Sequence, residues 1–427
     1  MNKIGNMMTE SKKKKKVVIF SDHALCTSGV GVQTRHLIEG LLKKYPGEWS
    51  FRQFGAAIKH ANYDTVVVNE DFIIKPIDGF GNPELMRVTL ATEKPDIILL
   101  FTDPRFFIWL FEMEDEIHQI CPLAWWHVWD NYPSPTFNDP LYEATDLINC
   151  HSYLTYEMCN KKHSEKTNFV PHTLPKDIFY PFSDSERQNA KQQLLGPKRM
   201  DHFTVLWINR NARRKRPGDL LWAWSMFMKK LEKKHGRQNA TLVLHTDPTD
   251  QEGPNLFTVT DHLGIRDSVV FSTERVDFTH INALHNISDC CINISYAEGF
   301  GLATLEAMQT GTPIIALKTG GMTRQVVDYR DGSENGVALP VELQSLVGSQ
   351  TVPYIYEDYV SPETVADALM KMYDMGDEDR HKLGQKSREY VLSDFSHETT
   401  IDLWHETLSS TIEKWNKDYK SWECNTI

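Results

Sequence analysis

Two glutamates eight positions apart, Glu298 and Glu306, enclose a short segment that could hold a phosphate. The segment reads Glu-Gly-Phe-Gly-Leu-Ala-Thr-Leu-Glu and lies between apolar runs at 290–295 and 312–316, which predicts a strand, a glycine-rich turn, a short helix and another strand. Free N–H groups at the start of that helix would bind a phosphate. A phosphate would repel Glu298, so this carboxylate is better suited to accept hydrogen bonds from hydroxyls. A sugar nucleotide carries both kinds of group.

Two cations, Arg210 and Lys215, lie in a basic loop directly after the apolar run 203–208. Ligands of α/β domains bind at the carboxyl ends of the strands, so this loop would reach the same crevice. There the two cations could neutralise a diphosphate leaving group as it gains charge. The alternative is a solvated basic loop, which the nearby glutamate turn makes the weaker reading.

The first half of the chain offers a glycine loop and a histidine. Gly29 and Gly31 follow the apolar strand 17–21 and open a helix. Thr34 stands where a dinucleotide fingerprint needs a third glycine or alanine, which disfavours an NAD-dependent dehydrogenase. The loop is therefore either a tight turn without a ligand or an approach to a phosphate or sugar. His127 ends a strand that contains two tryptophans. It is either a structural histidine or a hydrogen-bond partner of a sugar hydroxyl.

Apolar strands alternate with helical segments in both halves of the chain. This pattern indicates two doubly wound α/β domains with parallel sheets, separated by a polar stretch at 184–201. A length of 427 residues fits two or three domains. The one D-x-D match, Asp377-Glu-Asp379, follows no strand and reads as a helix start, so we predict no metal site.

Charge and cysteine content limit the classes of function. A net charge of −12 argues against a general nucleic-acid or anionic-membrane binder, although the run Lys12–Lys16 could contact an anionic surface instead of forming a solvated tail. No run of 18 apolar residues predicts a transmembrane helix, and no signal-peptide pattern is present. Seven cysteines without a C-x-x-C motif fit free thiols in a reducing compartment, so we expect a cytoplasmic protein.

The segment from Glu298 to Met308, followed by Gly311-Thr-Pro and Gly320-Gly321, resembles the E-x7-E signature of glycosyltransferase family 4. The glycine loop, the histidine, the R-x4-K pair and a final helix extend this resemblance over nearly the whole chain. The family consists mostly of retaining enzymes with the GT-B fold. The resemblance therefore implies two Rossmann-like domains facing a central cleft, with a C-terminal helix that crosses back to the first domain. The implied division is a flexible basic tail at 1–15, an acceptor-side domain at 16–185, a nucleotide-sugar domain at 186–395 and the crossing helix at 396–427.

The resemblance also implies a role for each matched residue. The implied catalytic residues are Glu298 on the donor-sugar hydroxyls, Arg210 and Lys215 on the diphosphate, and His127 near the reacting carbon. The implied binding residues are Phe300, Gly301 and Leu302 on the distal phosphate, Glu306 on the ribose, Gly29 and Gly31 on the phosphate from the opposite domain, and Arg275 and Val276 near the nucleobase. Family members generally need no metal or other cofactor, and their donor is a UDP- or GDP-linked sugar.

Three features depart from the family pattern. The glycine loop is Gly-Val-Gly instead of an adjacent pair, and His172-Thr173 stands where the family often has Asn-Gly. The segment Ser349–Tyr356 reads as an insertion and resembles glycosyltransferases of phages and other viruses.

The predicted function is transfer of a sugar from a nucleoside diphosphate sugar to a hydroxyl, with retention of anomeric configuration. The expected acceptor is a carbohydrate or glycoconjugate. A hydroxymethylated DNA base, as in phage DNA glycosylation, is the alternative acceptor, and the basic segments at 12–16 and 210–216 are its only support. A GT-B epimerase would not need the E-x7-E turn. A catalytically silent nucleotide-sugar-binding protein is the alternative that is not an enzyme.

Overall fold

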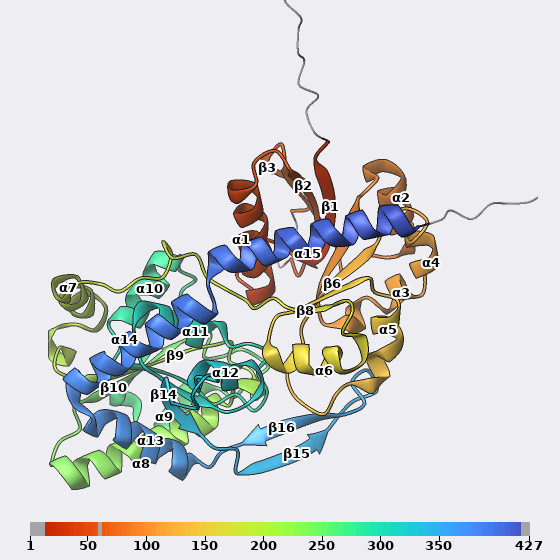
Figure 1. Ribbon diagram of the computed structural model, residues 1–427. Helices are drawn as coiled ribbons and strands as arrows, with labels where there is room; N and C mark the ends of the chain where they lie inside the picture. Colours follow the sequence, from red (N-terminus) through yellow and green to blue (C-terminus); the bar gives the residue numbers. More distant parts are fainter. Residues whose placement is uncertain (1–12, 59–61, 420–427) are drawn as a thin grey trace, which may run out of the picture.

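The computed structural model describes residues 13–58 and 62–419, and its strands form two large sheets and one small hairpin (Figure 1). Each large sheet carries helices on both faces, because its strands are apolar on both sides and must be covered from both. The two sheets belong to separate halves of the sequence. This arrangement of two doubly wound α/β domains confirms the fold predicted from the sequence.

The first sheet has eight strands in the order β3-β4-β2-β1-β5-β6-β7-β8, all parallel except β3. Its strand order reverses between β1 and β5, which places a ligand-binding position at the carboxyl ends of these two strands. The strands are β1 (Lys15–Asp22), β2 (Trp49–Ala56), β3 (Val66–Asn69), β4 (Phe72–Pro76), β5 (Ile97–Thr102), β6 (Leu123–His127), β7 (Leu147–Cys150) and β8 (Thr167–Phe169).

Alternate residues of β1 pack against the two helical layers of this domain. Val17 and Ile19 face one layer, and Val18 and Phe20 face the other, as the two-residue period of a strand requires. The helices are α1 (Gly29–Lys44), α2 (Pro83–Glu93), α3 (Ile108–Phe111), α4 (Glu114–Ile117), α5 (Asp139–Glu143) and α6 (Tyr153–His163), with 3-10 turns at Pro104–Phe106 and Thr136–Asn138.

The second sheet has six parallel strands in the order β11-β10-β9-β12-β13-β14. This is the Rossmann order, and it reverses between β9 and β12. The strands are β9 (Phe203–Ile208), β10 (Ala240–His245), β11 (Val269–Ser272), β12 (Cys290–Asn293), β13 (Ile314–Leu317) and β14 (Gly336–Leu339). The helices are α7 (Asp184–Leu195), α8 (Pro217–His235), α9 (Leu256–Leu263), α10 (Phe278–Asn286), α11 (Leu302–Thr310), α12 (Thr323–Val326), α13 (Pro362–Asp374) and α14 (Gly376–Asp394), with 3-10 turns at Pro197–Arg199, Arg213–Lys215, Arg266–Ser268 and Gly320–Met322.

The last helix, α15 (His397–Asp418), leaves the second domain and lies across the first, beside α1 (Figure 1). Trp404, Leu408 and Ile412 enter the core that β1 and β2 also build. A side chain on Gly40 of α1 would lie 2.4 Å from Ile401 Cδ1, so the glycine allows the two helices to touch. The crossing helix predicted from the sequence is therefore present.

The lysine run near the N-terminus belongs in part to the first sheet. Strand β1 begins at Lys15, inside the predicted tail 1–15, and Lys14 Nζ lies 2.6 Å from Asp71 Oδ2. Lys16 Nζ lies 3.3 Å from Glu93 Oε2. Residues 1–12, with the first lysine of the run, lie outside the described residues. The other predicted boundary, at 185–186, falls in the first turn of α7, and the domain limits stay a prediction.

Candidate active site

The reversal of strand order in the second sheet brings two distant loops together. The loop after β9 carries Lys215, and the turn after β12 carries Glu298. Lys215 Nζ donates a hydrogen bond to Glu298 Oε2, and the two side chains are only 11% and 12% exposed. Burying two charges removes their hydration, so the pair depends on neighbouring protein groups for its stabilisation.

Arg214 brings a second cation to the same carboxylate. Its Nη1 lies 3.7 Å from Glu298 Oε1 and 3.6 Å from Asp130 Oδ2, and donates to the carbonyl oxygen of Ala297 at 2.8 Å. Burial by itself would raise the pKa of Glu298, but the charges of Lys215 and Arg214, with hydrogen bonds from Lys215 and Ser295, lower it to about 2. Glu298 is therefore an ionised acceptor of hydrogen bonds at neutral pH.

Helix α11 starts directly after this turn with uncovered N–H groups. Its N-cap is Gly301, in the left-handed region at φ +90°, and no side chain accepts a hydrogen bond from the first turn. Gln325 holds the turn in place, because its Nε2 donates to the Phe300 carbonyl at 2.7 Å and its Oε1 accepts from Thr304 Oγ1 at 2.6 Å. The backbone from Phe300 to Leu302 thus presents a helix start suited to a phosphate.

The glycine loop of the first domain lies against the start of α11. A side chain on Gly29 would come within 2.9 Å of Leu302 Cδ1, so this glycine allows the two domains to approach. A side chain on Gly31 would lie 2.5 Å from the carbonyl oxygen of His23, so this glycine serves the local turn instead. Ser28 caps α1 by accepting a hydrogen bond from the Gly31 N–H at 3.0 Å. The two glycines are thus explained without a dinucleotide fingerprint.

The structure places the His127 ring away from the Glu298 turn. Residues two apart on a strand point to the same face, so His127 shares the face of Trp125, whose ring centre is 4.2 Å away. His127 Nε2 forms a hydrogen bond of 2.8 Å with the Tyr142 hydroxyl, and the residue is 1% exposed. These contacts fit the structural reading of this histidine, and its role as a contact of the donor sugar stays a prediction.

A different histidine, His151, points at the turn. It follows β7 as His127 ends β6, and its Nδ1 is 2.9 Å from the carbonyl oxygen of His127. A side chain on Gly299 would lie 2.9 Å from His151 Nε2. Burial and repulsion by His127 lower the pKa of His151 to about 3, so its ring is neutral at pH 7. His151 directly follows the apolar run 147–150, and no motif in the sequence marked it as a site residue.

Asp130 is the second residue that the sequence analysis did not assign to the site. Its Oδ1 would lie 2.7 Å from a side chain on Gly299, and its Oδ2 pairs with Arg214 of the other domain. The signal available was its position three residues after the strand of His127. Asp130 is thus a first-domain carboxylate that lies directly against the glutamate turn.

The remaining predicted residues lie around this centre. Arg210 is 57% exposed and pairs with Asp250, with Nε 2.7 Å from Oδ2. Glu306 Oε2 lies 3.1 Å from Nε2 of the buried His285. Arg275 and Val276 lie between β11 and α10, where Arg275 is exposed. Glu298, Lys215, the start of α11 and Gly29 are therefore assembled at one place, whereas Arg210 is turned toward Asp250.

The structure describes the ranges 13–58 and 62–419. Within them no group of three or more histidine, cysteine and carboxylate side chains is placed to hold a metal ion. None of the helices there is both long and apolar enough to span a bilayer. Metal independence of the reaction stays a prediction.

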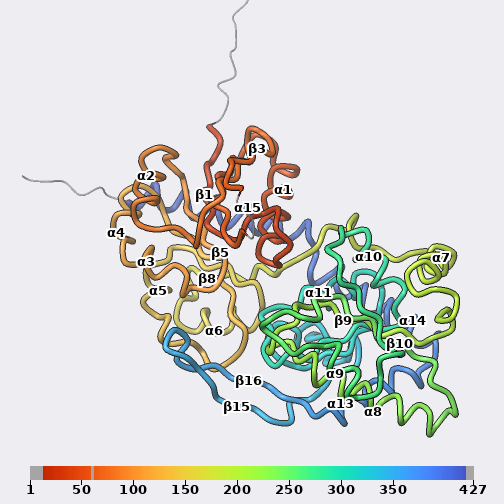
Figure 2. Tube along the Cα trace, turned by 180° about the vertical axis from the view of Figure 1, so that it is seen from behind, coloured from red at the N-terminus to blue at the C-terminus, as the bar shows by residue number. Residues whose placement is uncertain are grey.

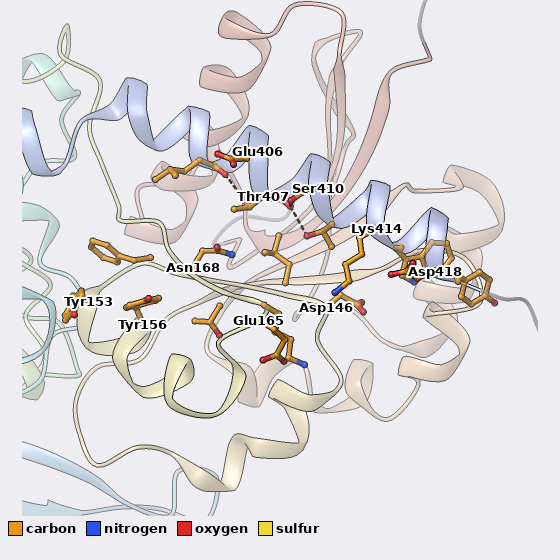
Figure 3. A pocket seen from close by; sticks show the side chains of 18 residues that line it. Asp146, Tyr153, Tyr156, Glu165, Asn168, Glu406, Thr407, Ser410, Lys414 and Asp418 are labelled. Atoms are coloured by element: carbon orange, nitrogen blue, oxygen red, sulfur yellow. Dashed lines mark hydrogen bonds between the residues drawn. The ribbon is translucent and has the colours of Figure 1, made fainter.

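The open groove of about 1040 Å³ in Figure 3 is a separate feature. It lies between α15 and the edge strand β8, and the labelled side chains of Thr407, Ser410 and Lys414 line it from the helix side. A second hollow, of about 310 Å³, lies on the second domain near Arg187 and Arg388. None of the predicted site residues lines either hollow.

Known proteins resemble this chain in the sequence of its second domain and in its overall fold. Residues 188–390 match the family described as Glycosyl transferases group 1. A D-inositol 3-phosphate glycosyltransferase of Catenulispora acidiphila is 28% identical over 155 residues, which cover 36% of this chain and 35% of that protein. The chain therefore spans about a third of the length of this curated relative.

Two solved structures resemble nearly the whole chain. Sucrose-phosphate synthase from Thermosynechococcus elongatus superposes with a TM-score of 0.72 at 17% identity, covering 94% of this chain and all of that one. HepE from Anabaena, solved with UDP and glucose, superposes with a TM-score of 0.68 at 18% identity, covering 93% and 100%. The chain has the GT-B fold. In GT-B terms, the Glu298 turn belongs to the second Rossmann-like domain and faces the glycine loop of the first.

Proposed function

We propose that this protein is a retaining glycosyltransferase that moves a sugar from a nucleoside diphosphate sugar to a hydroxyl of a carbohydrate or glycoconjugate. The observation that carries the proposal is the buried pair of Lys215 and Glu298 beside the open start of α11. This arrangement brings together a carboxylate for sugar hydroxyls, and an ammonium group and free N–H groups for phosphates, from the loop after β9 and the turn after β12. The match of residues 188–390 to group 1 glycosyl transferases supports the same activity.

An anionic donor needs more positive charge than the paired side chains of the site supply. Lys215 and Arg214 are balanced by Glu298 and Asp130, so a diphosphate needs further positive groups. The start of α11 supplies a partial positive charge. Arg210 can supply a whole one, because its exposed pair with Asp250 is worth only about 0–1 kcal/mol and is easily exchanged for a phosphate. This supports the predicted role of Arg210 although its side chain is turned away here.

The proposed reaction takes place on one face of the sugar. The bond between the anomeric carbon and the leaving diphosphate oxygen breaks, and the acceptor oxygen forms its bond to the same carbon from the same side. The acceptor proton passes to the departing diphosphate oxygen. Lys215 and the N–H groups of α11 stabilise the charge that develops on the diphosphate, while Glu298 holds the sugar hydroxyls. Asp130 and neutral His151 form the first-domain wall beside the reacting sugar.

The proposed base of the donor nucleotide rests on a structural relative alone. HepE, which shares the fold, was solved with UDP and glucose, and this favours a UDP-linked sugar over a GDP-linked one. Glu306, next to His285 on the side of α10, remains the proposed ribose contact. Arg275 and Val276 remain the proposed border of the base.

A DNA acceptor loses its two supporting features in the structure. The lysines at 13, 14 and 16 pair with Asp96, Asp71 and Glu93. The five cations of the loop 210–216 each have a carboxylate partner within 4 Å. Among the described cations of these two segments only Lys15, whose Nζ donates to Ser409 Oγ, lacks a carboxylate partner, so little uncompensated positive charge is left there for a phosphate backbone. We therefore favour the carbohydrate acceptor. The six described cysteines are free thiols, which supports a reducing, cytoplasmic location.

A thermal-shift screen of nucleotide sugars tests the proposal, followed by an assay for free nucleoside diphosphate. A donor present at about 100 times its Kd adds roughly 2.7 kcal/mol to the free energy of unfolding, which gives a measurable shift. UDP-sugars and GDP-sugars are compared at equal concentration. Release of diphosphate in the presence of acceptor supports a transferase, whereas binding without any release identifies the catalytically silent alternative.

A further inference from the structure

The small hairpin of β15 (Leu343–Val347) and β16 (Ile355–Tyr359) is not used by the proposed reaction. It is inserted between β14 and α13, pairs with neither large sheet, and contains the whole segment Ser349–Tyr356 that reads as an insertion. Figures 1 and 2 show that it reaches from the second domain to α5 and α6 of the first. The chain itself crosses between the domains at 170–183 and before α15, at the opposite end of their boundary. The hairpin is therefore a third link, on the far side.

The tip of the hairpin is bound to the loop that follows His127. Val352 and Ile355 pack on a buried cluster of Trp129, Leu154 and Met158. The Tyr354 hydroxyl accepts a hydrogen bond of 3.1 Å from the Thr136 N–H, and its ring lies edge-on to Phe137 at 5.0 Å. Burial of these apolar groups stabilises the link in addition to its hydrogen bonds.

The base of the hairpin holds the same loop through a buried carboxylate. Asp358 is 3% exposed, and its Oδ2 accepts hydrogen bonds from Asn131 Nδ2 at 2.7 Å and from Thr319 Oγ1 at 2.6 Å. Its Oδ1 accepts from Gln344 Nε2 at 2.7 Å. The backbone adds a bond of 2.7 Å from the Tyr356 N–H to the Tyr132 carbonyl oxygen. A buried carboxylate with three donors is a rigid point of attachment.

The two residues that donate to Asp358 Oδ2, Asn131 and Thr319, are sequence neighbours of residues at the proposed site. Asn131 follows Asp130, which lies against Gly299 and pairs with Arg214. Thr319 precedes Gly320, where a side chain would lie 2.0 Å from the Glu298 carbonyl oxygen and 2.5 Å from the Asp130 carbonyl oxygen. The carboxylate thus joins the two backbone segments whose contact sets Asp130 against the Glu298 turn.

We infer that Asp358 is a positioning residue of the transferase site and that the β15–β16 hairpin is the clasp that keeps the two domains together there. Asp358 acts through Asn131 and Thr319 and touches neither proposed substrate. The kinetic part of this inference rests on the proposed function. The part that concerns the arrangement of the domains does not.

The kinetic test compares Asp358→Ala with Asp358→Asn and with Leu343→Ala. Asparagine keeps an oxygen for Asn131 and Thr319, and Gln344 can turn its amide to match, so Asp358→Asn should stay within about threefold of wild-type kcat. Asp358→Ala should lower kcat by roughly tenfold to a hundredfold, since a displacement of about 1 Å at a reacting centre costs that much, with the donor KM nearly unchanged. Leu343 is 64% exposed on the same hairpin, so Leu343→Ala should behave as wild type. Equal kcat values for the two alanine variants, or a loss confined to donor KM, would overturn the positioning role.

Small-angle X-ray scattering of the ligand-free protein tests the clasp without reference to activity. Asp358→Ala should give a larger radius of gyration than wild type, and Leu343→Ala should not. Tyr354→Phe removes only the hydroxyl at the tip, so it should increase the radius of gyration by less than Asp358→Ala does. This variant keeps the test usable if Asp358→Ala folds poorly. Identical scattering from wild type and from both clasp variants would refute the clasp. A protein that shows the scattering change but transfers no sugar would keep the clasp and reject the proposed function.

Discussion

The two Rossmann-like domains share the same strand order at their switch points, but the pKa values of the carboxylates at these positions shift in opposite directions. In the first domain, Asp22 ends β1 and Asp103 follows β5, and burial raises the pKa of both. Burial also lowers the pKa of His151 to about 3. In the second domain, Lys215 and Arg214 overcome the same effect of burial and lower the pKa of Glu298 to about 2. At Glu298 the nearby cations therefore outweigh burial, whereas burial dominates at Asp22, Asp103 and His151 and also lowers the pKa of Lys215.

This difference shows what topology decides and what it leaves open. Strand order places a ligand-binding edge on each domain, and the two edges meet at Gly29 and Leu302. Side chains after the strands then decide which edge can hold an anionic donor. The first-domain edge carries one ion-paired carboxylate, Asp130, and no described cation against the turn, so we expect the diphosphate on the second-domain edge, where Lys215, Arg214 and the start of α11 lie. The predictions below test this division.

The largest effect is expected at the buried ion pair of the second domain. Glu298→Gln and Lys215→Ala should each lower turnover by at least roughly 10²–10³, because each removes a group that we propose to contact the donor. Glu298→Gln also leaves the buried Lys215 without its carboxylate partner, which costs about 3–5 kcal/mol of the free energy of unfolding. Lys215→Ala should cost less, because Glu298 keeps Arg214 at 3.7 Å. Turnover is measured by diphosphate release and stability by urea unfolding. Near wild-type turnover in either variant would contradict the assignment.

A double variant separates these two losses. Glu298→Gln with Lys215→Met removes both charges, so the free energy of unfolding should recover most of what each single variant loses. Turnover should stay as low as in the single variants. Recovery of both properties together would mean that the pair is structural only.

A smaller effect on stability, with a clear effect on catalysis, is expected at Arg210. Arg210→Ala should raise the donor KM or lower kcat by about tenfold or more, because a phosphate partner is lost. The free energy of unfolding should change by less than about 1 kcal/mol, since the pair with Asp250 is exposed. Arg87→Ala, which breaks an exposed pair with Glu116 in the first domain, is the matched control and should leave the kinetics unchanged. Equal kinetics for both variants would remove Arg210 from the site.

The contact between the two edges can be tested with glycine substitutions. Gly299→Ala would place a methyl group 2.7 Å from Asp130 Oδ1 and should lower kcat/KM by roughly tenfold, because the two edges must separate. Gly29→Ala meets only the flexible end of Leu302, at 2.9 Å, and should have a smaller effect. Gly218→Ala has 3.8 Å to its nearest neighbour and should have none. The reverse order of effects would show that the site does not need this contact.

The smallest expected effect concerns acid stability of the first-domain edge. The pKa of His151 is about 3 in the fold and near 6.5 in the unfolded chain, so the unfolded state takes up a proton first as the pH falls. The stability that neutral His151 contributes is complete above pH 6.5 and is lost progressively between pH 6.5 and 3. His151→Gln should therefore flatten the fall in unfolding free energy by up to about 1.4 kcal/mol per pH unit in this window.

Urea titrations at several pH values measure this slope. The exposed His262 provides the control, and His262→Gln should leave the slope as it is in wild type. An unchanged slope in His151→Gln would mean that this histidine is already protonated or solvated in the fold.

Much of the architecture and part of the site could be predicted from local sequence patterns. The run around Glu298 predicted a strand, a turn, a helix and a strand, and the structure has β12, α11 and β13 there. The final helix and its return to the first domain were also predicted. The role of His127 stays a prediction, and the structure adds His151, which lies against the turn. No local pattern marks His151, because the face on which a strand-end residue lies depends on the register and packing of the whole sheet. Arg214 was not predicted, because the R-x4-K spacing selects only Arg210 and Lys215.

The amino-acid sequence alone sets the types of element and the chemistry available at the strand ends, because periodicity and turn residues act over short distances. It also placed Glu298 after one strand and Lys215 after another. Only the tertiary structure decided that these two meet in a buried pair, that Arg210 turns to Asp250, and that Asp358 ties the domains together from a hairpin. These outcomes depend on contacts between residues far apart in the chain, where burial and competing partners set each charge, and no local pattern records them.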